Sequence, residues 1–171
     1  MSHHLDVLVL DQLQSWGWDD ILFVECGDGW AAEEAWRRRL TRGHVVALDM
    51  SPGAIERART LRGVPGRVEF ATWDGRQLCH ANEVFDQLIS SFAFRHSPDP
   101  EALAHEMLRV LRPRGELYAL EPESGAAQFR SLLTLAGFSD VENVASCRHE
   151  LDRGVALESA VVIHARARRF E

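Results

Sequence analysis

The sequence has no lysine, and its acidic residues outnumber its basic ones. All 19 basic residues are arginine, against 26 aspartate and glutamate residues, so the formal net charge is −7 at pH 7. GC-rich coding is the simplest explanation of arginine without lysine, and selection for the planar guanidinium fork is the alternative. Domains that bind nucleic acid are usually basic or carry a basic stripe. The charge balance therefore predicts a protein that does not bind nucleic acid.

Cysteine is also scarce, and long apolar runs are missing. Cys26, Cys79 and Cys147 show no metal-like spacing, and an odd number of thiols is typical of a reducing compartment. We therefore expect free thiols and no metal site. The longest apolar runs, such as Ala160–Ile163, fall far short of the roughly 18 residues that a membrane span needs. The first residues lack the pattern of a signal peptide. These absences predict a cytoplasmic protein without a transmembrane segment.

Length and pattern predict one domain. The 171 residues are close to the ~150 of an average domain, so we expect a single domain over residues 1–171. A lead-in helix within residues 1–19 precedes a core over residues 20–167. Short apolar runs alternate with longer amphipathic stretches, which is the pattern of βα units. The expected strands are 21–24, 45–48, 68–70, 85–90, 116–120, 141–147 and 158–165, and the expected helices are 5–14, 31–40, 51–61, 99–111 and 126–136.

The order of these segments predicts an α/β fold. Seven strands and five helices fit a Rossmann-like, doubly wound sheet that is mainly parallel. The last two strands alternate apolar and polar residues, so we expect them to close the sheet as an antiparallel pair. In such a sheet, ligands bind at the carboxyl ends of the strands, near the point where the strand order reverses. Functional residues are therefore expected in the loops that follow the strands.

The loop after the first expected strand is a candidate cofactor site. Gly27 and Gly29 let the backbone turn tightly and approach a ligand at the start of the next helix. The same glycines also fit a dinucleotide-binding motif. Glu25 argues against that alternative, because its carboxylate would repel a pyrophosphate. The carboxylate suits the ammonium group of a nucleoside that carries an amino acid.

Two further acidic residues follow the second and third expected strands. Asp49 lies about 20 residues after Gly29, where a carboxylate accepts hydrogen bonds from both hydroxyls of a ribose. Asp74 is placed to accept from the exocyclic amine of adenine, with Trp73 as an apolar flank for the ring. Each acid alone is more often a solvated loop carboxylate. Three acids at three successive strand ends, together with the glycine loop, predict a nucleoside site.

With these features, residues 18 to 167 resemble the class I S-adenosylmethionine-dependent methyltransferases. Arg109–Gly115 resembles the family motif R-V-L-K-P-G-G, and Leu135–Phe138 resembles its late A-G-F. The resemblance implies a seven-stranded sheet whose last strand is antiparallel, and S-adenosylmethionine as the cofactor. The residues that it implies in cofactor binding are Glu25, Gly27, Gly29, Asp49, Met50, Trp73, Asp74 and Ser91.

Two segments are similar to the ubiquinone/menaquinone C-methyltransferase branch of this family. They are Ser91–His96 and Arg153–Leu157. This resemblance implies a small or quinone-like methyl acceptor, and catalysis that rests mainly on in-line positioning of the reactants. His96 is the candidate general base if a carbon atom is methylated. A loop histidine bonded to the backbone is the alternative for the same residue.

The sequence departs from the pattern of these methyltransferases, and two of the departures bear on function. Trp30 stands in the glycine loop, where family members carry a small residue, and would fill part of the methionine pocket. Only a short connection separates Glu121 from the helix at Ala126, so the insertion that covers the substrate in this branch is missing. The alternative hypothesis is therefore an accessory subunit, similar to a methyltransferase, that has lost its chemistry. It would associate peripherally with a larger protein assembly instead of binding a small-molecule acceptor.

Overall fold

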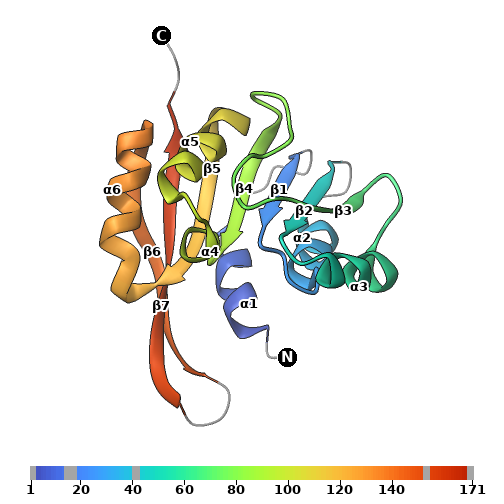
Figure 1. The fold of residues 1–171 in the computed structure, drawn as a ribbon, viewed down its shortest axis with the longest axis horizontal. Helices are drawn as coiled ribbons and strands as arrows, with labels where there is room; N and C mark the ends of the chain where they lie inside the picture. The colour runs from blue at the N-terminus through green and yellow to red at the C-terminus, as the bar shows by residue number, and fades with distance from the viewer. Residues whose placement is uncertain (1–2, 14–18, 40–42, 152–154, 169–171) are drawn as a thin grey trace.

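The computed structural model describes residues 3–13, 19–39, 43–151 and 155–168, and a seven-stranded sheet forms its centre (Figure 1). The strands are β1 (Ile21–Val24), β2 (Val45–Asp49), β3 (Val68–Thr72), β4 (Phe85–Ser91), β5 (Leu111–Pro122), β6 (Phe138–Leu151) and β7 (Val155–Ala167). Their order is β3-β2-β1-β4-β5-β7-β6, and β7 runs antiparallel to both of its neighbours. The predicted doubly wound sheet with an antiparallel last strand is therefore confirmed.

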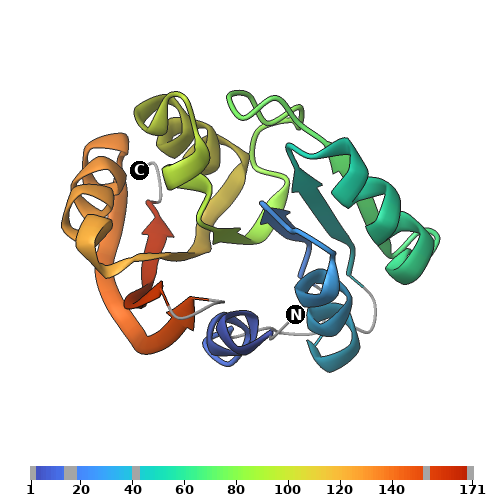
Figure 2. The same cartoon turned by 60° about the horizontal axis from the view of Figure 1, so that its bottom comes forward.

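Helices cover both faces of the sheet, and β1 shows why. The helices are α1 (His4–Leu10), α2 (Trp30–Arg39), α3 (Pro52–Arg62), α4 (Ala93–His96), α5 (Pro100–Val110) and α6 (Ala126–Ala136), with a short 3-10 turn, η1 (Glu123–Gly125). All four residues of β1 are buried, and alternate side chains point to opposite faces. Leu22 and Val24 join the core beneath α5 and α6, whereas Ile21 and Phe23 join the core beneath α1, α2 and α3. Figure 2 shows these two groups of helices around the sheet. A parallel strand buried on both faces needs such a continuous apolar run.

Two helices begin where the sequence predicts. Ser51 caps α3, because its Oγ accepts a hydrogen bond from the backbone N–H of Ala54 at 3.3 Å. Asp99 caps α5 in the same way, and its Oδ1 accepts from the N–H of Ala102 at 3.0 Å. A proline occupies the first turn of both helices, where no backbone donor is needed. These caps fix where α3 begins after β2 and where α5 begins after α4.

The structure corrects several predicted boundaries. Helix α1 ends at Leu10, whereas the prediction extends it to residue 14, which lies outside the described residues. Strand β5 begins at Leu111, whereas the prediction starts it at residue 116; Leu111 pairs with Phe85, and the next pair joins Glu116 to Gln87. The intervening residues therefore bulge out of the ladder. Helix α4 was not predicted, because four residues are too few to show a helical period.

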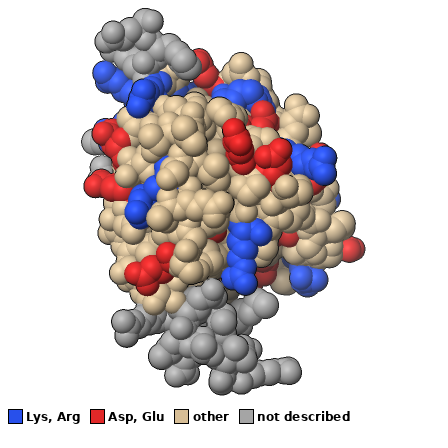
Figure 3. All heavy atoms as spheres, turned by 60° about the vertical axis from the view of Figure 1, so that its left-hand side comes forward, with Lys and Arg blue, Asp and Glu red and all other residues tan. Residues whose placement is uncertain are grey.

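The surface carries charges of both signs. On the face shown in Figure 3, arginine and acidic side chains are interspersed and do not gather into a basic stripe. This face therefore lacks the usual footprint of a nucleic-acid-binding protein. Within the described ranges, none of the helices has the length and apolar character needed to cross a membrane.

Candidate functional site

The carboxyl ends of β1, β2 and β4 border a pocket of about 330 Å³. The strand order reverses here, because β1 pairs with β2 on one side and with β4 on the other. Such a reversal opens a crevice, which is the usual ligand site of a doubly wound sheet. Five predicted site residues line this pocket: Glu25, Gly27, Asp49, Ser91 and His96. The other lining residues are His3, Leu5, Asp6, Cys26, Asp28, Phe92 and Leu120.

The loop between β1 and α2 follows an unusual backbone path. Glu25, Gly27 and Gly29 all have positive φ angles, of 62°, 57° and 78°. Glycine adopts this left-handed conformation without a steric penalty, whereas Glu25 adopts it at a cost. At Gly29 a side chain would also collide, since an added Cβ would lie 2.5 Å from Cε1 of Phe70. At Gly27 an added Cβ would meet nothing within 4 Å, so the backbone there has open space beside it.

Glu25 presents a partly buried carboxylate at the pocket wall. Its Oε1 accepts a hydrogen bond from Nε1 of Trp73 at 3.0 Å, and its Oε2 lies 3.6 Å from Nδ1 of His96. Only 11% of the side chain is exposed. Burial, and secondarily the nearby Asp49, raises the pKa of Glu25 above its usual value. A desolvated carboxylate of this kind gains strongly from a cationic partner.

Asp49 ties the end of β2 to the glycine loop. Its Oδ2 accepts from the backbone N–H of Gly27 at 2.8 Å, and its Oδ1 accepts from the N–H of Ser51 at 2.8 Å. The residue is buried, with 7% of its surface exposed. Each carboxylate oxygen has two lone pairs, so both atoms keep the capacity to accept a further hydrogen bond. Asp49 can therefore hold the loop and bind a ligand at the same time.

Four predicted site residues are not among the described residues that line the pocket. The Trp73 side chain is buried and reaches Glu25, as described above. Asp74 is exposed, and its Oδ1 accepts from the N–H groups of residues 76 and 77 at 2.9 and 3.0 Å. These hydrogen bonds lower the pKa of Asp74. Met50 packs against Gly75, and Gly29 faces Phe70. Their assignment to a cofactor stays a prediction.

Sequence reasoning missed the contribution of the N-terminal segment. His3 stacks on Trp30 with the ring centroids 4.4 Å apart and an interplanar angle of 16°. The Nδ1 atom of His3 lies 3.2 Å from Oδ2 of Asp6, and both residues line the pocket. Trp30 was expected to fill part of the methionine pocket, yet it is not among the described lining residues. No local sequence signal gives this arrangement, because it depends on where α1 docks.

The pocket is strongly acidic. Asp6, Glu25, Asp28 and Asp49 all line it, and of the described lining residues only histidines can carry a positive charge. Cys26 adds no anion, because burial and then Asp49 raise the pKa of its thiol well above the usual range. Such a wall favours a ligand that carries positive charge.

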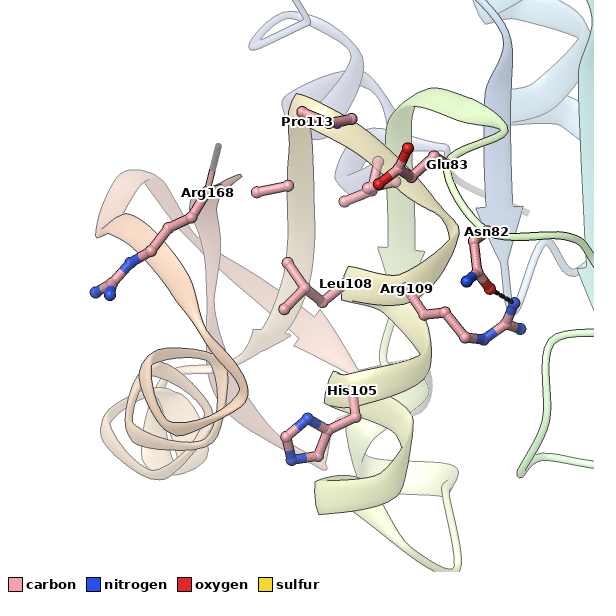
Figure 4. A pocket seen from close by; sticks show the side chains of 9 residues that line it. Asn82, Glu83, His105, Leu108, Arg109, Pro113 and Arg168 are labelled. Carbon is pink, nitrogen blue, oxygen red and sulfur yellow. Dashed lines mark hydrogen bonds between the residues drawn. The ribbon is translucent and has the colours of Figure 1, made fainter. Parts of the chain in front are cut away.

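A second cavity, of about 270 Å³, lies between α5, the start of β5 and the end of β7 (Figure 4). Arg109 borders it but is held by the protein itself. Its Nη1 donates to Oδ1 of Asn82 at 3.0 Å, and its Nε donates to Oε1 of Glu106 at 2.7 Å. The guanidinium therefore fixes the fold and is not presented to a ligand. The acidic pocket at the carboxyl ends of the strands remains the candidate site.

Comparison with known proteins assigns the chain to a family. Residues 22–119 match the methyltransferase domain family. The matched segment includes the glycine loop, Asp49, Ser91 and His96, which are the residues that meet in the acidic pocket. The chain belongs to this family, the class I S-adenosylmethionine-dependent methyltransferases.

Similar sequences include quinone methyltransferases. The chain is 37% identical over 78 residues to a demethylmenaquinone methyltransferase of Clavibacter sepedonicus, a match that covers 46% of this chain and 32% of that protein. It is 34% identical over 104 residues to a ubiquinone/menaquinone biosynthesis C-methyltransferase of Pseudomonas putida, covering 59% of this chain and 41% of that protein. The match therefore spans less than half the length of either relative.

Solved structures share the fold over nearly the whole chain. The methyltransferase in a complex with the Trm112 methyltransferase activator of Haloferax volcanii matches with a TM-score of 0.82 at 18% identity, over 99% of this chain and 90% of that one. An S-adenosylmethionine-dependent methyltransferase from Mesorhizobium loti matches with a TM-score of 0.72 at 17% identity, over 92% and 95% of the two chains. At sequence identities of 17–18%, this structural similarity shows a shared fold and nothing further.

Proposed function

We propose that this protein binds S-adenosylmethionine in the acidic pocket and transfers its methyl group to a small or quinone-like acceptor. The observation that carries the proposal is the meeting of Glu25, Asp49, Ser91 and the glycine loop around one pocket. These residues come from three separate strand ends, and the family implies the same cofactor for them. The acidic wall also matches a ligand with an ammonium and a sulfonium group.

The residues present fit the cofactor, and each has a distinct task. Glu25 would bind the ammonium group, and the open space beside Gly27 would admit the methionine end close to the backbone. Asp49 would accept from the ribose hydroxyls, while Trp73 and Asp74 would border the adenine. Ser91, at the end of β4, would lie beside the sulfonium. The cofactor supplies an electrophilic methyl group, so the protein has mainly to align the acceptor with it.

His96 is the group best placed to accept a proton from the acceptor. Its side chain is 49% exposed at the pocket rim, and its Nδ1 faces Oε2 of Glu25 at 3.6 Å. The carboxylate would orient the ring and stabilise the imidazolium that forms when a carbon atom of the acceptor loses its proton. The similarity of this chain to two quinone methyltransferases supports an acceptor of that class. We place the protein in the cytoplasm.

Calorimetric titration with S-adenosylhomocysteine tests the cofactor assignment without knowledge of the acceptor. We expect a micromolar Kd, which corresponds to about −8 kcal/mol. Glu25→Gln should weaken binding by at least about tenfold, because it removes a buried charge partner of the ammonium. Glu56→Gln, an exposed carboxylate on α3, is the matched control and should bind like the wild type. A folded wild-type chain that does not bind would refute the proposal.

A second candidate function is an accessory subunit without chemistry of its own. Two observations favour it: the link between β5 and α6 is only the short turn η1, and a structure of the same fold was solved with an activator protein. A large partner would then supply the missing cover of the pocket. One measurement distinguishes the two functions. The isolated chain is incubated with S-adenosylmethionine and a demethylated quinol, and the formation of S-adenosylhomocysteine is followed. Turnover by an isolated monomer would rule out the accessory role.

A further inference from the structure

The glycine loop needs an external support to keep its shape. Three of its residues, Glu25, Gly27 and Gly29, lie in the left-handed region, and Glu25 has a side chain that disfavours it. A strained conformation persists only where surrounding contacts determine it. Asp49 supplies one such contact, through the N–H of Gly27. Within the loop, the N–H of Gly29 donates to the Cys26 carbonyl at 2.9 Å and the N–H of Trp30 donates to Oδ1 of Asp28 at 3.0 Å. These contacts leave the carbonyl and Oδ2 of Asp28 available to groups outside the loop.

Arg62, in the last turn of α3, makes two contacts with Asp28 and one with α2. Its Nε donates to the backbone carbonyl of Asp28 at 3.0 Å, and its Nη2 lies 3.5 Å from the Asp28 carboxylate. Its Nη1 donates to Oε2 of Glu33, in the first turn of α2, at 2.9 Å. The side chain is 21% exposed, so solvent screens these contacts only partly. One guanidinium thus joins α3, the loop and α2.

We propose that Arg62 is a positioning residue for the cofactor site. Its guanidinium holds Asp28, and Asp49 holds the adjacent Gly27, so two neighbouring anchors keep the loop on the path that presents Glu25 to a ligand. Arg62 is not among the described residues that line the pocket, so it acts through the loop and touches no ligand. This inference rests on the proposed function of the pocket.

The contact pattern explains why an arginine occupies this position. The planar guanidinium donates in two directions at once, to a backbone carbonyl and to the Glu33 carboxylate. A lysine ammonium on a flexible stem keeps the charge but does not reproduce this fixed fork. If the guanidinium fork holds the loop, the positive charge of a lysine does not replace it. If Arg62 acts only through its charge, lysine at this position would preserve ligand binding.

The test compares two ligands that differ at the end held by the loop. S-adenosylhomocysteine carries the amino-acid portion, and 5′-methylthioadenosine lacks it. We expect Arg62→Met to weaken S-adenosylhomocysteine binding about tenfold, or about 1.4 kcal/mol, in calorimetric titration. Binding of 5′-methylthioadenosine should stay within about twofold of the wild type, because the adenosine contacts lie elsewhere. Arg57→Met, an exposed residue on the same helix, is the control and should change neither affinity.

A general loss of structure would lower both affinities together, and that outcome would overturn the inference. Unchanged S-adenosylhomocysteine binding in Arg62→Met would overturn it too. If Arg62→Met does not fold, Arg62→Lys carries the test, and we expect the same selective loss; affinity equal to the wild type would refute the role of the fork. A wild-type chain that binds neither ligand would instead refute the proposed function.

Discussion

Replacing Glu121 by glutamine is expected to stabilise the protein by an amount that grows with pH. Glu121 lies at the end of β5 with none of its surface exposed. Its Oε1 accepts from the backbone N–H of Phe94 at 3.1 Å, and among the described residues its Oε2 finds no hydrogen-bond partner. Burial raises the pKa of Glu121 to about 8, against the opposing effects of the Phe94 amide and of Arg95. The folded protein therefore holds a neutral carboxyl group at neutral pH.

The magnitude follows from the difference between the folded and unfolded pKa of this group. The unfolded chain releases the proton near pH 4.5, and the folded chain releases it near pH 8. Between these values the folded state binds more protons, so its stability falls as the pH rises. One pKa unit corresponds to 1.36 kcal/mol, which makes the loss about 3 kcal/mol at pH 7 and about 5 kcal/mol well above pH 8. Glutamine has no proton to release and escapes this loss.

Urea denaturation of the wild type and of Glu121→Gln at pH 5 and pH 8 measures the effect. The difference in unfolding free energy between the two proteins should grow by about 3–4 kcal/mol from pH 5 to pH 8. Glutamine keeps an oxygen to accept from the Phe94 N–H, so the comparison changes mainly the titration. Glu123→Gln, an exposed residue two positions later, should follow the wild type. A difference that is the same at both pH values would refute the reasoning.

Three further predictions concern the glycine loop and Glu25. Gly29→Ala should lower the free energy of unfolding, measured in urea, by about 2–4 kcal/mol, because it adds backbone strain and a collision with Phe70. Gly27→Ala adds only backbone strain and should cost less. Equal losses of stability in the two variants would contradict the argument. Trp73→Phe keeps an aromatic side chain but removes the N–H whose hydrogen bond Glu25 accepts, so S-adenosylhomocysteine binding should weaken severalfold by titration, and an unchanged affinity would contradict this role of Trp73. The ionised carboxylate of Glu25 binds the ammonium group, and the pKa of Glu25 is raised. As the solution is acidified, the affinity for S-adenosylhomocysteine should therefore begin to fall at a higher pH than an ordinary glutamate would give. Glu25→Gln should show no such fall, and matching pH profiles of the two proteins would oppose this assignment.

The site was predictable from the sequence to the extent that strand ends are predictable. Glu25, Asp49 and Ser91 follow buried apolar runs, and parallel strands bring their carboxyl ends to one edge of the sheet. That rule was enough to predict that these residues lie around one pocket. It did not place Trp73 against Glu25, since the direction of a side chain in the loop after β3 depends on packing and not on position in the sequence.

Local patterns along the chain determined the fold class, the caps of α3 and α5, and the glycine loop, because these features depend on residues close together in sequence. Tertiary structure alone decided which distant groups meet: His3 on Trp30, Arg62 on Asp28, and His96 beside Glu25. It also decided that Glu121 is buried, and burial raises the pKa of this carboxyl group to about 8. Contacts of this kind depend on how helices dock against the sheet, and no local pattern in the sequence encodes that docking.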